Sequence, residues 1–358
     1  MTDALKSFAD AIRAAAAAKR PLRLRGGGSK DFYGQAIAGE VLDTRGYAGV
    51  LAYEPTELVV TAKCGTPLAE LEATLRENGQ MLAFEPPHYG AQATVGGMLA
   101  AGLSGPRRAS AGAVRDFVLG VTLMDARGET MRFGGTVMKN VAGYDVSRLI
   151  AGSMGTLGLV LDASLKVLPL PAAEATLRFE MPEDKAIETL NRWAGRPLPV
   201  SASAFASGEL HVRLSGARAA IDSARAKLGG ECLEDAQARA FWSGIREHTD
   251  EFFRAAARLW RISLPSAAPS LQLPGGQLIE WSGALRWLAT GADARTLREA
   301  ARRAGGHATL FRGGSDEERR SAGVFHPLEP ALARIHRDLK ASFDPDGIFN
   351  RGRMYADF

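Results

Sequence analysis

Residues 21–29 read Pro-Leu-Arg-Leu-Arg-Gly-Gly-Gly-Ser, an apolar segment that runs directly into three glycines and a serine. Leucines at alternate positions favour a short strand, and the glycines after them favour a tight turn. In such a turn, bare backbone amides and the serine hydroxyl can surround an anion such as a pyrophosphate. Three glycines in a row are about as often a plain turn, and the stretch is neither a P-loop nor a G-x-G-x-x-G motif. Taken alone, it predicts a phosphate site only weakly.

Two more glycine-rich stretches follow the first in order. Residues 93–97 read Ala-Thr-Val-Gly-Gly and open a helix of small residues predicted for 94–105. Glycines and a hydroxyl at a helix N-terminus suit a phosphate, with tight helix packing as the alternative. The third stretch comprises 139–145, Lys-Asn-Val-Ala-Gly-Tyr-Asp, and 152–158, Gly-Ser-Met-Gly-Thr-Leu-Gly. Because each glycine costs backbone entropy, three such stretches in order indicate a ligand rather than folding alone.

The segments around these loops alternate between helices and short strands. A helix over 3–19, with Thr2 or Asp3 as its N-cap, precedes the first strand, and a helix over 68–77 ends at Asn78-Gly79. The remaining signals in this half are strands at 39–42, 50–53 and 58–62, a hairpin of 117–125 with 130–133, and a pair of short strands within 157–168.

Pro169 and Pro171 mark the first candidate domain boundary. The segments that follow have the order β-α-β-β-α-β, which is ferredoxin-like. Its strands are predicted at 176–180, 201–206, 209–214 and 231–233, and its helices at 184–194 and 217–228. A long helical stretch at 236–257, strands at 260–264 and 278–288, and a last helix at 329–343 complete the chain.

The composition describes an ordinary globular protein large enough for two domains. The chain has 358 residues, of which 46% are hydrophobic and 23% charged, and this excludes disorder as its main state. A net charge of +4 without a basic block argues against nucleic-acid binding. Cys64 and Cys232 lie far apart without a C-x-x-C, so any iron–sulfur centre must belong to a partner. Without a signal-peptide or membrane-span pattern, we expect a cytoplasmic protein that reaches the inner membrane only through partner subunits.

Five stretches together resemble the p-cresol methylhydroxylase and vanillyl-alcohol oxidase (PCMH-type) superfamily. Residues 25–29, 93–97, 115–120 and 152–158 resemble its FAD-binding domain. The ending 343–350, Phe-Asp-Pro-Asp-Gly-Ile-Phe-Asn, resembles its C-terminal signature. The resemblance therefore reaches from one end of the chain to the other.

Residues 139–145 and the short cap resemble the glycolate oxidase group within this superfamily. The resemblance implies an α+β fold, in which a two-lobed PCMH-type FAD-binding domain carries a ferredoxin-like α+β cap domain. It implies an FAD-binding domain at 1–172, a cap or substrate domain at 173–325, and a C-terminal segment at 326–358 that returns to the first domain.

The resemblance also implies a set of FAD-binding residues by motif position. The first loop would contact the pyrophosphate, the second would form another phosphate-side loop, and the third would contact FAD through its backbone. Asn350 would lie where the C-terminal segment returns towards the flavin. The set is Arg25, Gly26, Gly27, Gly28, Ser29, Thr94, Gly96, Gly97, Asp116, Gly155, Gly158, Val160 and Asn350. For Asp116, the alternative is a buried ion pair with Arg115.

The histidines set this chain apart from several members of the superfamily. The first loop continues through 29–33 without a histidine, so we expect FAD to be bound non-covalently. The six histidines form no His-x-His element, so we expect no metal site. His88, after two prolines, is either a proton acceptor near the flavin or incidental. Candidate partners of a substrate carboxylate are Arg107, Arg108, Arg312, Arg319 and Arg320.

The function implied by the resemblance is that of an FAD-binding subunit of a glycolate oxidase complex. Such a complex oxidises glycolate to glyoxylate, and in the family its partners are a larger homologous FAD subunit and an iron–sulfur subunit. One alternative is a self-sufficient FAD-dependent dehydrogenase of another 2-hydroxy acid or alcohol. The other is a non-catalytic scaffold subunit, against which the three retained glycine loops argue.

Overall fold

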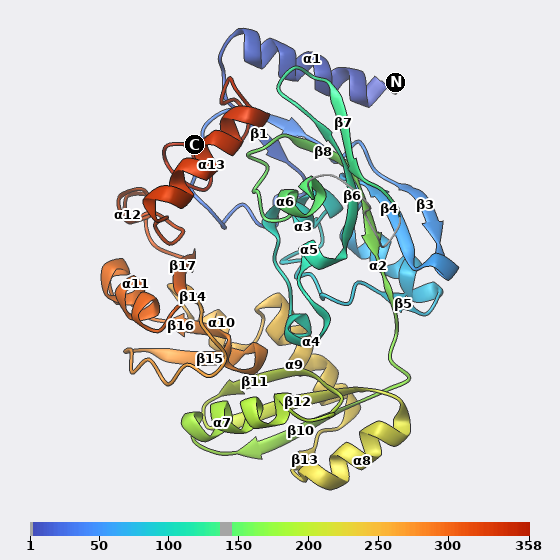
Figure 1. Ribbon diagram of the computed structural model, residues 1–358, viewed down its shortest axis with the longest axis vertical. Coiled ribbons are helices and arrows are strands. Elements are labelled where there is room, and N and C mark those ends of the chain that lie inside the picture. Colours follow the sequence, from blue (N-terminus) through green and yellow to red (C-terminus); the bar gives the residue numbers. More distant parts are fainter. Residues whose placement is uncertain (1–2, 137–144) are drawn as a thin grey trace.

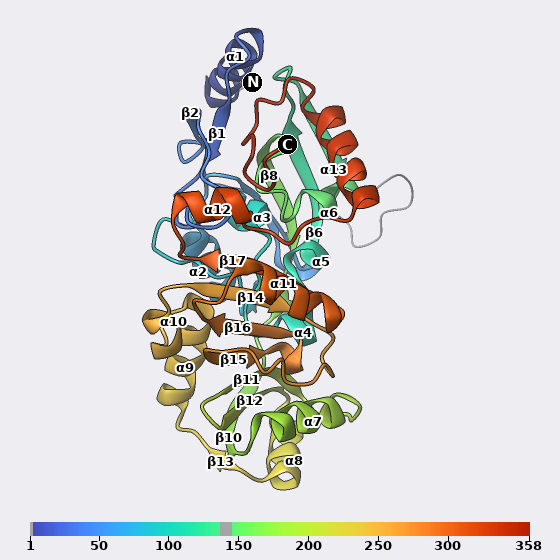
Figure 2. The ribbon, with the colours of Figure 1, turned by 90° about the vertical axis from the view of Figure 1, so that its left-hand side faces the viewer.

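The computed structural model describes residues 3–136 and 145–358, which form two α+β bodies stacked end to end (Figure 1). The body drawn at the top of Figure 1 holds both ends of the chain, and the body below it is formed by the middle of the chain. Figure 2 shows the same division from the side, with an extended sheet running through the lower body.

The upper body is built on a five-stranded antiparallel sheet in the order β3-β4-β8-β6-β7. Its central strand β8 is buried on both faces, which matches its run of apolar and small residues. Two shorter sheets flank it, the parallel pair β1-β2 and the antiparallel pair β5-β9. The strands of this body are β1 (Leu22–Arg25), β2 (Glu40–Asp43), β3 (Val50–Glu54), β4 (Val59–Lys63), β5 (Gln80–Met81), β6 (Val118–Met124), β7 (Thr130–Gly134), β8 (Leu159–Lys166) and β9 (Leu168–Pro169).

Short helices pack on the sheet of this body. Helix α3 packs against β8 and β4, and α6 packs against β6 and β7. The helices are α1 (Asp3–Ala17), the 3-10 turn η1 (Pro55–Glu57), α2 (Leu68–Glu77), α3 (Val95–Ala101), α4 (Arg108–Ala111), α5 (Val114–Phe117) and α6 (Val146–Ile150).

The lower body contains one eight-stranded antiparallel sheet in the order β13-β10-β12-β11-β15-β16-β14-β17. Its first four strands, with α7 and α8, have the strand order of a ferredoxin-like unit, as predicted. The elements are β10 (Ala173–Glu180), α7 (Glu183–Ala194), β11 (Val200–Ala206), β12 (Glu209–Gly216), α8 (Arg218–Leu228), β13 (Glu231–Cys232), α9 (Asp235–Glu247), α10 (Glu251–Ala255), β14 (Leu259–Ser263), β15 (Gly276–Glu280), η2 (Trp281–Gly283), β16 (Leu285–Ala289), α11 (Ala294–Arg303), β17 (His307–Arg312) and α12 (Asp316–Ala322).

The end of the chain returns to the upper body through α13 (Pro330–Phe343). After this helix, Phe349 forms a parallel bridge with Leu22 of β1. The Leu22 amide donates to the Ile348 carbonyl at 2.7 Å, and the Asn350 amide donates to the Leu22 carbonyl at 2.9 Å. The C-terminal segment therefore borders the first glycine loop, as its predicted return to the first domain requires.

A hydrophobic cluster joins the two bodies. It combines Tyr33, Leu103 and Met154 of the upper body with side chains of the lower body that include Trp242 and Phe311. We propose domain boundaries at 172 and 325, because the eight-stranded sheet and the helix after it lie between these positions. No helix among the described residues is both long and apolar enough to cross a membrane.

Most predicted elements are present; the segment predicted as strand at 278–288 is divided into β15 and β16 by η2, and three further elements differ. The helix predicted for 94–105 ends at Ala101, because Gly102 turns the backbone into the left-handed region with φ +62°. The residues 157–168 form mainly one eight-residue strand, β8, since this strand lies between two partners. The helical stretch 236–257 divides into α9 and α10, because His248 adopts φ +54° and Asp250 caps a new helix.

Candidate functional site

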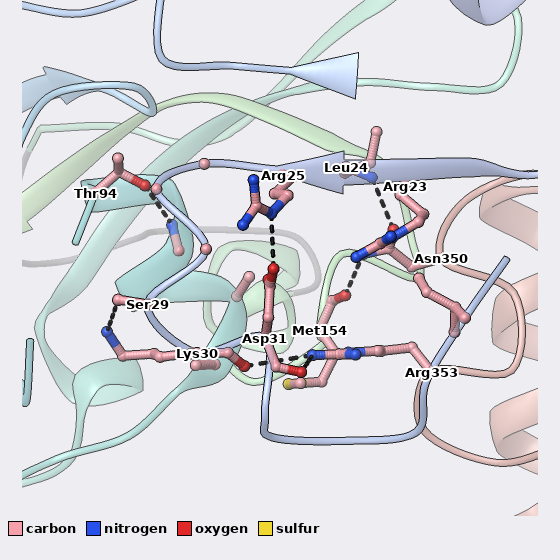
Figure 3. Close-up of a pocket in the computed structure, with 17 residues that line it drawn as sticks. Arg23, Leu24, Arg25, Ser29, Lys30, Asp31, Thr94, Met154, Asn350 and Arg353 are labelled. Carbon is pink, nitrogen blue, oxygen red and sulfur yellow. Dashed lines mark hydrogen bonds and ion pairs between the residues drawn. The ribbon is translucent and has the colours of Figure 1, made fainter. Parts of the chain in front are cut away.

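The first glycine loop lines a cleft in the upper body (Figure 3). Eight predicted residues line it: Arg25, Gly26, Gly27, Gly28, Ser29, Thr94, Gly97 and Asn350. Within the described part of the chain, no backbone amide of residues 26–30 donates a hydrogen bond to a protein acceptor. Five consecutive free amides after a strand can act as donors to a phosphate-bearing ligand.

The first glycine loop also packs very closely against the segment that precedes α3. A Cβ atom on Gly26 would lie 2.3 Å from Thr94 Oγ1, and one on Gly27 would lie 1.4 Å from the carbonyl oxygen of Gln92. At Gly27 the obstacle is backbone, so no side chain can be added without separating the two segments, whereas at Gly26 the Thr94 hydroxyl would have to move. These two glycines therefore serve the contact between loops, and that contact forms the cleft.

The second glycine loop presents fewer free donors than the first. The Val95 and Gly96 amides donate to the Thr66 and Cys64 carbonyls, at 3.0 and 2.8 Å. The Thr94 hydroxyl caps α3 by accepting from the Gly97 amide at 3.2 Å. A Cβ on Gly96 would lie 2.8 Å from the Cys64 Cβ, so this glycine faces the end of β4 and not the cleft. Only Thr94 and Gly97 of the predicted second loop border the cleft.

The third predicted loop closes the cleft through a neighbour of the predicted residues. Met154 lines the cleft, whereas Gly155, Gly158 and Val160 do not. A Cβ on Gly155 would lie 2.7 Å from Asn350 Nδ2, Gly158 packs against β6, and Val160 belongs to the hydrophobic core. The part of this prediction at 139–144, with Lys139, Asn140, Gly143 and Tyr144, lies outside the described residues.

Asn350 joins the first and third loops. Its Oδ1 accepts from the Leu24 amide at 2.8 Å, and its Nδ2 donates to the Met154 carbonyl at 2.6 Å. The residue is buried and adopts φ +41°, a conformation that asparagine tolerates better than most residues. Both ends of its amide are used, so Asn350 fixes the shape of the cleft beside any ligand.

Positive charge gathers at the cleft in residues that the sequence prediction missed. Arg23, Lys30 and Arg353 line it beside the predicted Arg25, which pairs with Asp31 at 2.7 Å. Burial lowers the pKa of Lys30 to about 8 and that of Arg353 to about 10. Arg353 donates to the Asp31 and Gln35 carbonyls, so the C-terminal segment holds the residues after the first loop in place. Arg353 lies three residues after the predicted Asn350, and this position was the sequence signal that could have identified it.

Asp116 lies away from the cleft. Its side chain is about half exposed and accepts from the Ala113 amide at 2.8 Å, where it caps α5. Arg115 is more exposed still, and its Nε lies 3.9 Å from the Asp116 carboxylate. The alternative of a buried ion pair is therefore wrong, because α5 presents both side chains to solvent.

The five candidate arginines occupy different environments. Arg107 is buried and paired with Glu174 at 2.6 Å, and Arg319 donates to the Phe32 and Gly34 carbonyls. Arg108 lies 4.4 Å from the centre of the Trp281 ring, and Arg320 is exposed. Arg312 remains, and it lines a second cavity next to the first glycine loop.

This second cavity lies between the two bodies and has a volume of about 610 Å³. It shares Ser29 with the first cleft and is bordered by Phe32, His88, Tyr89 and Arg312. Arg312 uses one guanidinium nitrogen to donate to the Phe253 carbonyl at 2.6 Å; its other donors have no partner among the described residues and can bind a ligand.

Two aromatic groups and a glutamate shape the wall of this cavity. The Tyr89 hydroxyl lies 3.3 Å from His248 Nε2, and His248 stacks on Phe253 at 3.8 Å between ring centres. Burial raises the pKa of Tyr89 and lowers that of His248 well below its usual value, so both are neutral near pH 7. Glu247 accepts from the backbone amides of His88 and Tyr89 at 3.0 and 2.9 Å, which fixes this turn.

The His88 side chain does not face the rings of Tyr89, His248 and Phe253. Its Nε2 lies 3.2 Å from a carboxylate oxygen of Glu72 on α2. Among the described residues, no group of three or more histidine, cysteine, aspartate or glutamate side chains is arranged to hold a metal ion.

Comparison with known proteins places this geometry in a family. Residues 4–134 match the family model described as an FAD binding domain. The chain is 47% identical to the glycolate oxidase subunit GlcE of Escherichia coli over 99% of its own length and 98% of that protein. It is 34% identical to the glycolate oxidase subunit GlcD of Bacillus subtilis over 36% of its own length, which is 27% of that protein.

The solved structures agree with the fold. A p-cresol methylhydroxylase structure with substrate bound superimposes with a TM-score of 0.70 over 99% of this chain and 87% of that chain, at 14% identity. An alkyldihydroxyacetonephosphate synthase superimposes with a TM-score of 0.65 over 96% of this chain and 75% of that chain, at 15% identity. The expected α+β fold with a PCMH-type FAD-binding domain is confirmed.

Proposed function

We propose, because the chain belongs to the GlcE family of glycolate oxidase subunits, that it binds FAD within a multi-subunit complex that oxidises glycolate to glyoxylate. The observation that carries this proposal is the 47% identity over the full length of both chains. The cleft supports it independently, since the free amides of residues 26–30 and the basic side chains beside them fit a pyrophosphate.

In this proposal, the first glycine loop binds the FAD pyrophosphate. The amides of Gly26, Gly27, Gly28 and Ser29 donate to the phosphate oxygens, and Arg25 and Lys30 supply positive charge. Thr94 and Gly97 border the same anion from the second loop, and Asn350 holds the third loop against it. Gly96, Gly155, Gly158, Val160 and Asp116 act on FAD only through the packing and capping described above.

On oxidation an alcohol loses a hydride, which carries both electrons, from carbon and a proton from its hydroxyl group; FAD, when bound, would accept the hydride, and the proton would pass to solvent. The substrate binds in the second cavity, beside Ser29, where Arg312 pairs with the glycolate carboxylate through its free donors. The aromatic side chains of this cavity limit the access of water, and near pH 7 Tyr89 is a neutral phenol and His248 a neutral imidazole.

The partners in this proposal are a larger homologous FAD subunit and an iron–sulfur subunit. The names of the two relatives support an assembly, since both are called subunits of a glycolate oxidase. The two cysteines of this chain, one buried and one exposed, are too few to ligate a cluster. Electrons therefore leave the chain for a partner, and we place the complex in the cytoplasm with membrane contact only through partner subunits.

The absorption spectrum of the purified chain after desalting tests this proposal. We expect a flavin spectrum, release of the flavin on denaturation because it is not covalently bound, and no glycolate turnover without partners. Glycolate turnover by the isolated chain would instead favour the self-sufficient dehydrogenase. A chain that stays colourless after addition of FAD would favour the scaffold subunit.

The role of Arg312 is tested in the assembled complex. We expect Arg312→Met to raise the KM for glycolate at least tenfold with a smaller change in kcat, and Arg320→Met, which is exposed on α12, to change neither. An unchanged KM for the Arg312 variant would remove it from substrate binding.

A further inference from the structure

A third cleft also lies at the junction between the two bodies. It is formed by α2, residues 171–172, the start of β10, β12, α8 and α9, and its volume is about 780 Å³. We call it the arginine cleft, because six arginines line it: Arg76, Arg213, Arg218, Arg225, Arg239 and Arg246. Only three acidic residues line it with them, Glu85, Glu174 and Asp235.

Two of these arginines have acidic partners. Arg213 is buried and pairs with Glu85 at 2.9 Å, and Arg246 pairs with Glu247 at 2.8 Å. Within the described part of the chain, the other four have no carboxylate within 4.0 Å: Arg76, Arg218, Arg225 and Arg239. All four are exposed, so the cleft carries an excess of positive charge that the protein itself does not neutralise.

The spacing of these arginines directs them to one place. Arg218 and Arg225 are seven residues apart on α8, and Arg239 and Arg246 are seven apart on α9. Seven residues make about two turns, so each pair shares one face of its helix. Both faces line the same cleft, and Arg76 at the end of α2 lines it from the upper body. Because like charges repel, gathering them here opposes folding unless a ligand neutralises them.

The lining of the cleft distinguishes between ligands. Sites for small molecules usually have volumes of about 300–1,000 Å³ and mostly apolar walls. The arginine cleft, at about 780 Å³, falls within this range of volume, but half of its lining residues are charged, and these charges come from several separate elements. One small anion can neutralise only one or two of them, whereas an extended chain with several carboxylates can reach them all.

We propose that the arginine cleft binds an acidic, extended segment of a partner protein in the oxidase complex. The inference rests on the proposed function in one respect, namely that the chain works with partner subunits. The segment would carry several aspartate or glutamate residues, which pair with the four free arginines across α2, α8 and α9. Its docking would also span the junction of the two bodies.

The cleft is connected to the second cavity by a single helix. Helix α9 carries Arg239 and Arg246 in the arginine cleft, and it ends at Glu247, which accepts from the His88 and Tyr89 amides. His88 and Tyr89 line the second cavity. A partner bound in the arginine cleft therefore contacts the helix that positions one wall of the proposed substrate site.

A fluorescein-labelled decaglutamate peptide is the probe for the first test. Its fluorescence anisotropy is measured with the full-length chain at 50 and 150 mM NaCl. We expect binding that the triple variant Arg218→Glu, Arg225→Glu, Arg239→Glu weakens at least tenfold. The matched control is Arg127→Glu, Arg302→Glu, Arg303→Glu, which makes the same change of net charge at exposed arginines outside the cleft and is expected to weaken binding less than threefold.

Several results would overturn this inference. They are no binding of the peptide by the wild-type chain, equal loss in both triple variants, displacement of the peptide by stoichiometric tripolyphosphate, and tighter binding of a ten-nucleotide single-stranded DNA. Flavin absorption per chain, expected to equal that of wild type in both variants, shows that the fold is retained. If the wild-type chain binds the peptide but no FAD, the proposed function is contradicted, while the arginine cleft remains a binding site for an acidic segment.

The second test uses the co-expressed complex. On size exclusion at 150 mM NaCl, we expect the cleft variant to elute separately from the other subunits and the control variant to elute with them. Intact complexes from both variants would show that the cleft is not where a partner docks.

Discussion

The first and second glycine loops look alike in sequence and differ in what their backbones do. Both combine consecutive glycines with a hydroxyl residue, and both lie beside the same cleft. The amides of residues 26–30 have no acceptor within the described chain, whereas Val95 and Gly96 donate to the Thr66 and Cys64 carbonyls. A glycine motif therefore predicts that something approaches closely, but not whether a ligand or the protein's own backbone does so.

The largest effect is expected at Gly27, where the two loops touch. Gly27→Ala would place a Cβ 1.4 Å from the Gln92 carbonyl oxygen, so the loops must separate and the cleft must change shape. We expect at least a hundredfold loss of FAD affinity, measured by flavin absorption after desalting, with thermal unfolding to show that the chain still folds. Gly46→Ala is the control, since no atom lies within 4 Å of its Cβ position. Intact assembly and activity of a complex that contains the Gly27 variant without its flavin would support the scaffold alternative.

The next effect is expected at Asn350. Asn350→Asp keeps the size of the side chain but places a second acceptor against the Met154 carbonyl oxygen. Loss of this buried bond should lower the free energy of unfolding by about 1–3 kcal/mol, and the new negative charge should weaken FAD binding about tenfold. Chemical denaturation and FAD titration measure the two effects. The same change at the exposed Asn78 is expected to alter neither, and equal behaviour of both variants would contradict the bridging role.

A substitution at Gly96 distinguishes an effect on packing from an effect on ligand binding. Gly96→Ala should destabilise the fold by about 1–3 kcal/mol, because its Cβ would lie 2.8 Å from that of Cys64. The FAD affinity of the folded chain should change less than threefold, since Gly96 faces away from the cleft. Urea unfolding of the apo chain and FAD titration distinguish the two quantities. A large loss of FAD affinity without loss of stability would give the second loop the role assigned to the first.

Lys30 gives the cleft a pH dependence. Its pKa of about 8 means that the ammonium group is mostly charged at pH 7 and mostly neutral at pH 9.5. We expect FAD to bind about fivefold more weakly at pH 9.5, because the phosphates lose this charge. The pKa of Lys30 in the folded chain lies below the unfolded value of about 10.4, so keeping the ammonium group charged in the folded state costs stability. This cost disappears between pH 8 and 10.4, and the free energy of unfolding therefore rises over that range.

Substitution of Lys30 isolates this contribution. Lys30→Met should remove most of the difference in FAD affinity between pH 7 and pH 9.5, and Lys63→Met, on β4 away from the cleft, should keep it. If both variants retain the full pH dependence, another group is responsible for it.

The smallest effect is expected at Asp116. Asp116→Ala removes the cap of α5 and should cost about 0.5–2 kcal/mol of stability, with FAD affinity unchanged. Thermal unfolding and FAD titration measure this. A tenfold loss of FAD affinity would show that Asp116 contributes to FAD binding.

Local patterns in the sequence predicted the secondary structure and the first loop well. Helix α2 has the predicted bounds, and the ferredoxin-like order appears as the sequence indicates. These features depend on neighbouring residues, which one sequence displays. The break at His248 was missed because a histidine in the left-handed region is uncommon and leaves no pattern in hydrophobicity.

The missed site residues have a different cause. Lys30 and Arg353 meet at the cleft only because the C-terminal segment returns to β1, and a pairing between residues over 300 positions apart has no local signal. Gly96 and Gly97 are adjacent in the motif, yet the turn of the helix points one to Cys64 and the other to the cleft. The residues that line the arginine cleft likewise come from separate helices, strands and loops.

Hydrogen–deuterium exchange of the backbone amides, with and without FAD, tests directly whether the first loop is the anion-binding loop. We predict that FAD slows exchange at residues 26–30, whose amides are free in the described chain, and leaves Val95 and Gly96 unchanged, since protein carbonyls already protect them. Unchanged exchange at residues 26–30, with new protection at 95–97, would contradict the assignment and move the pyrophosphate to the second loop.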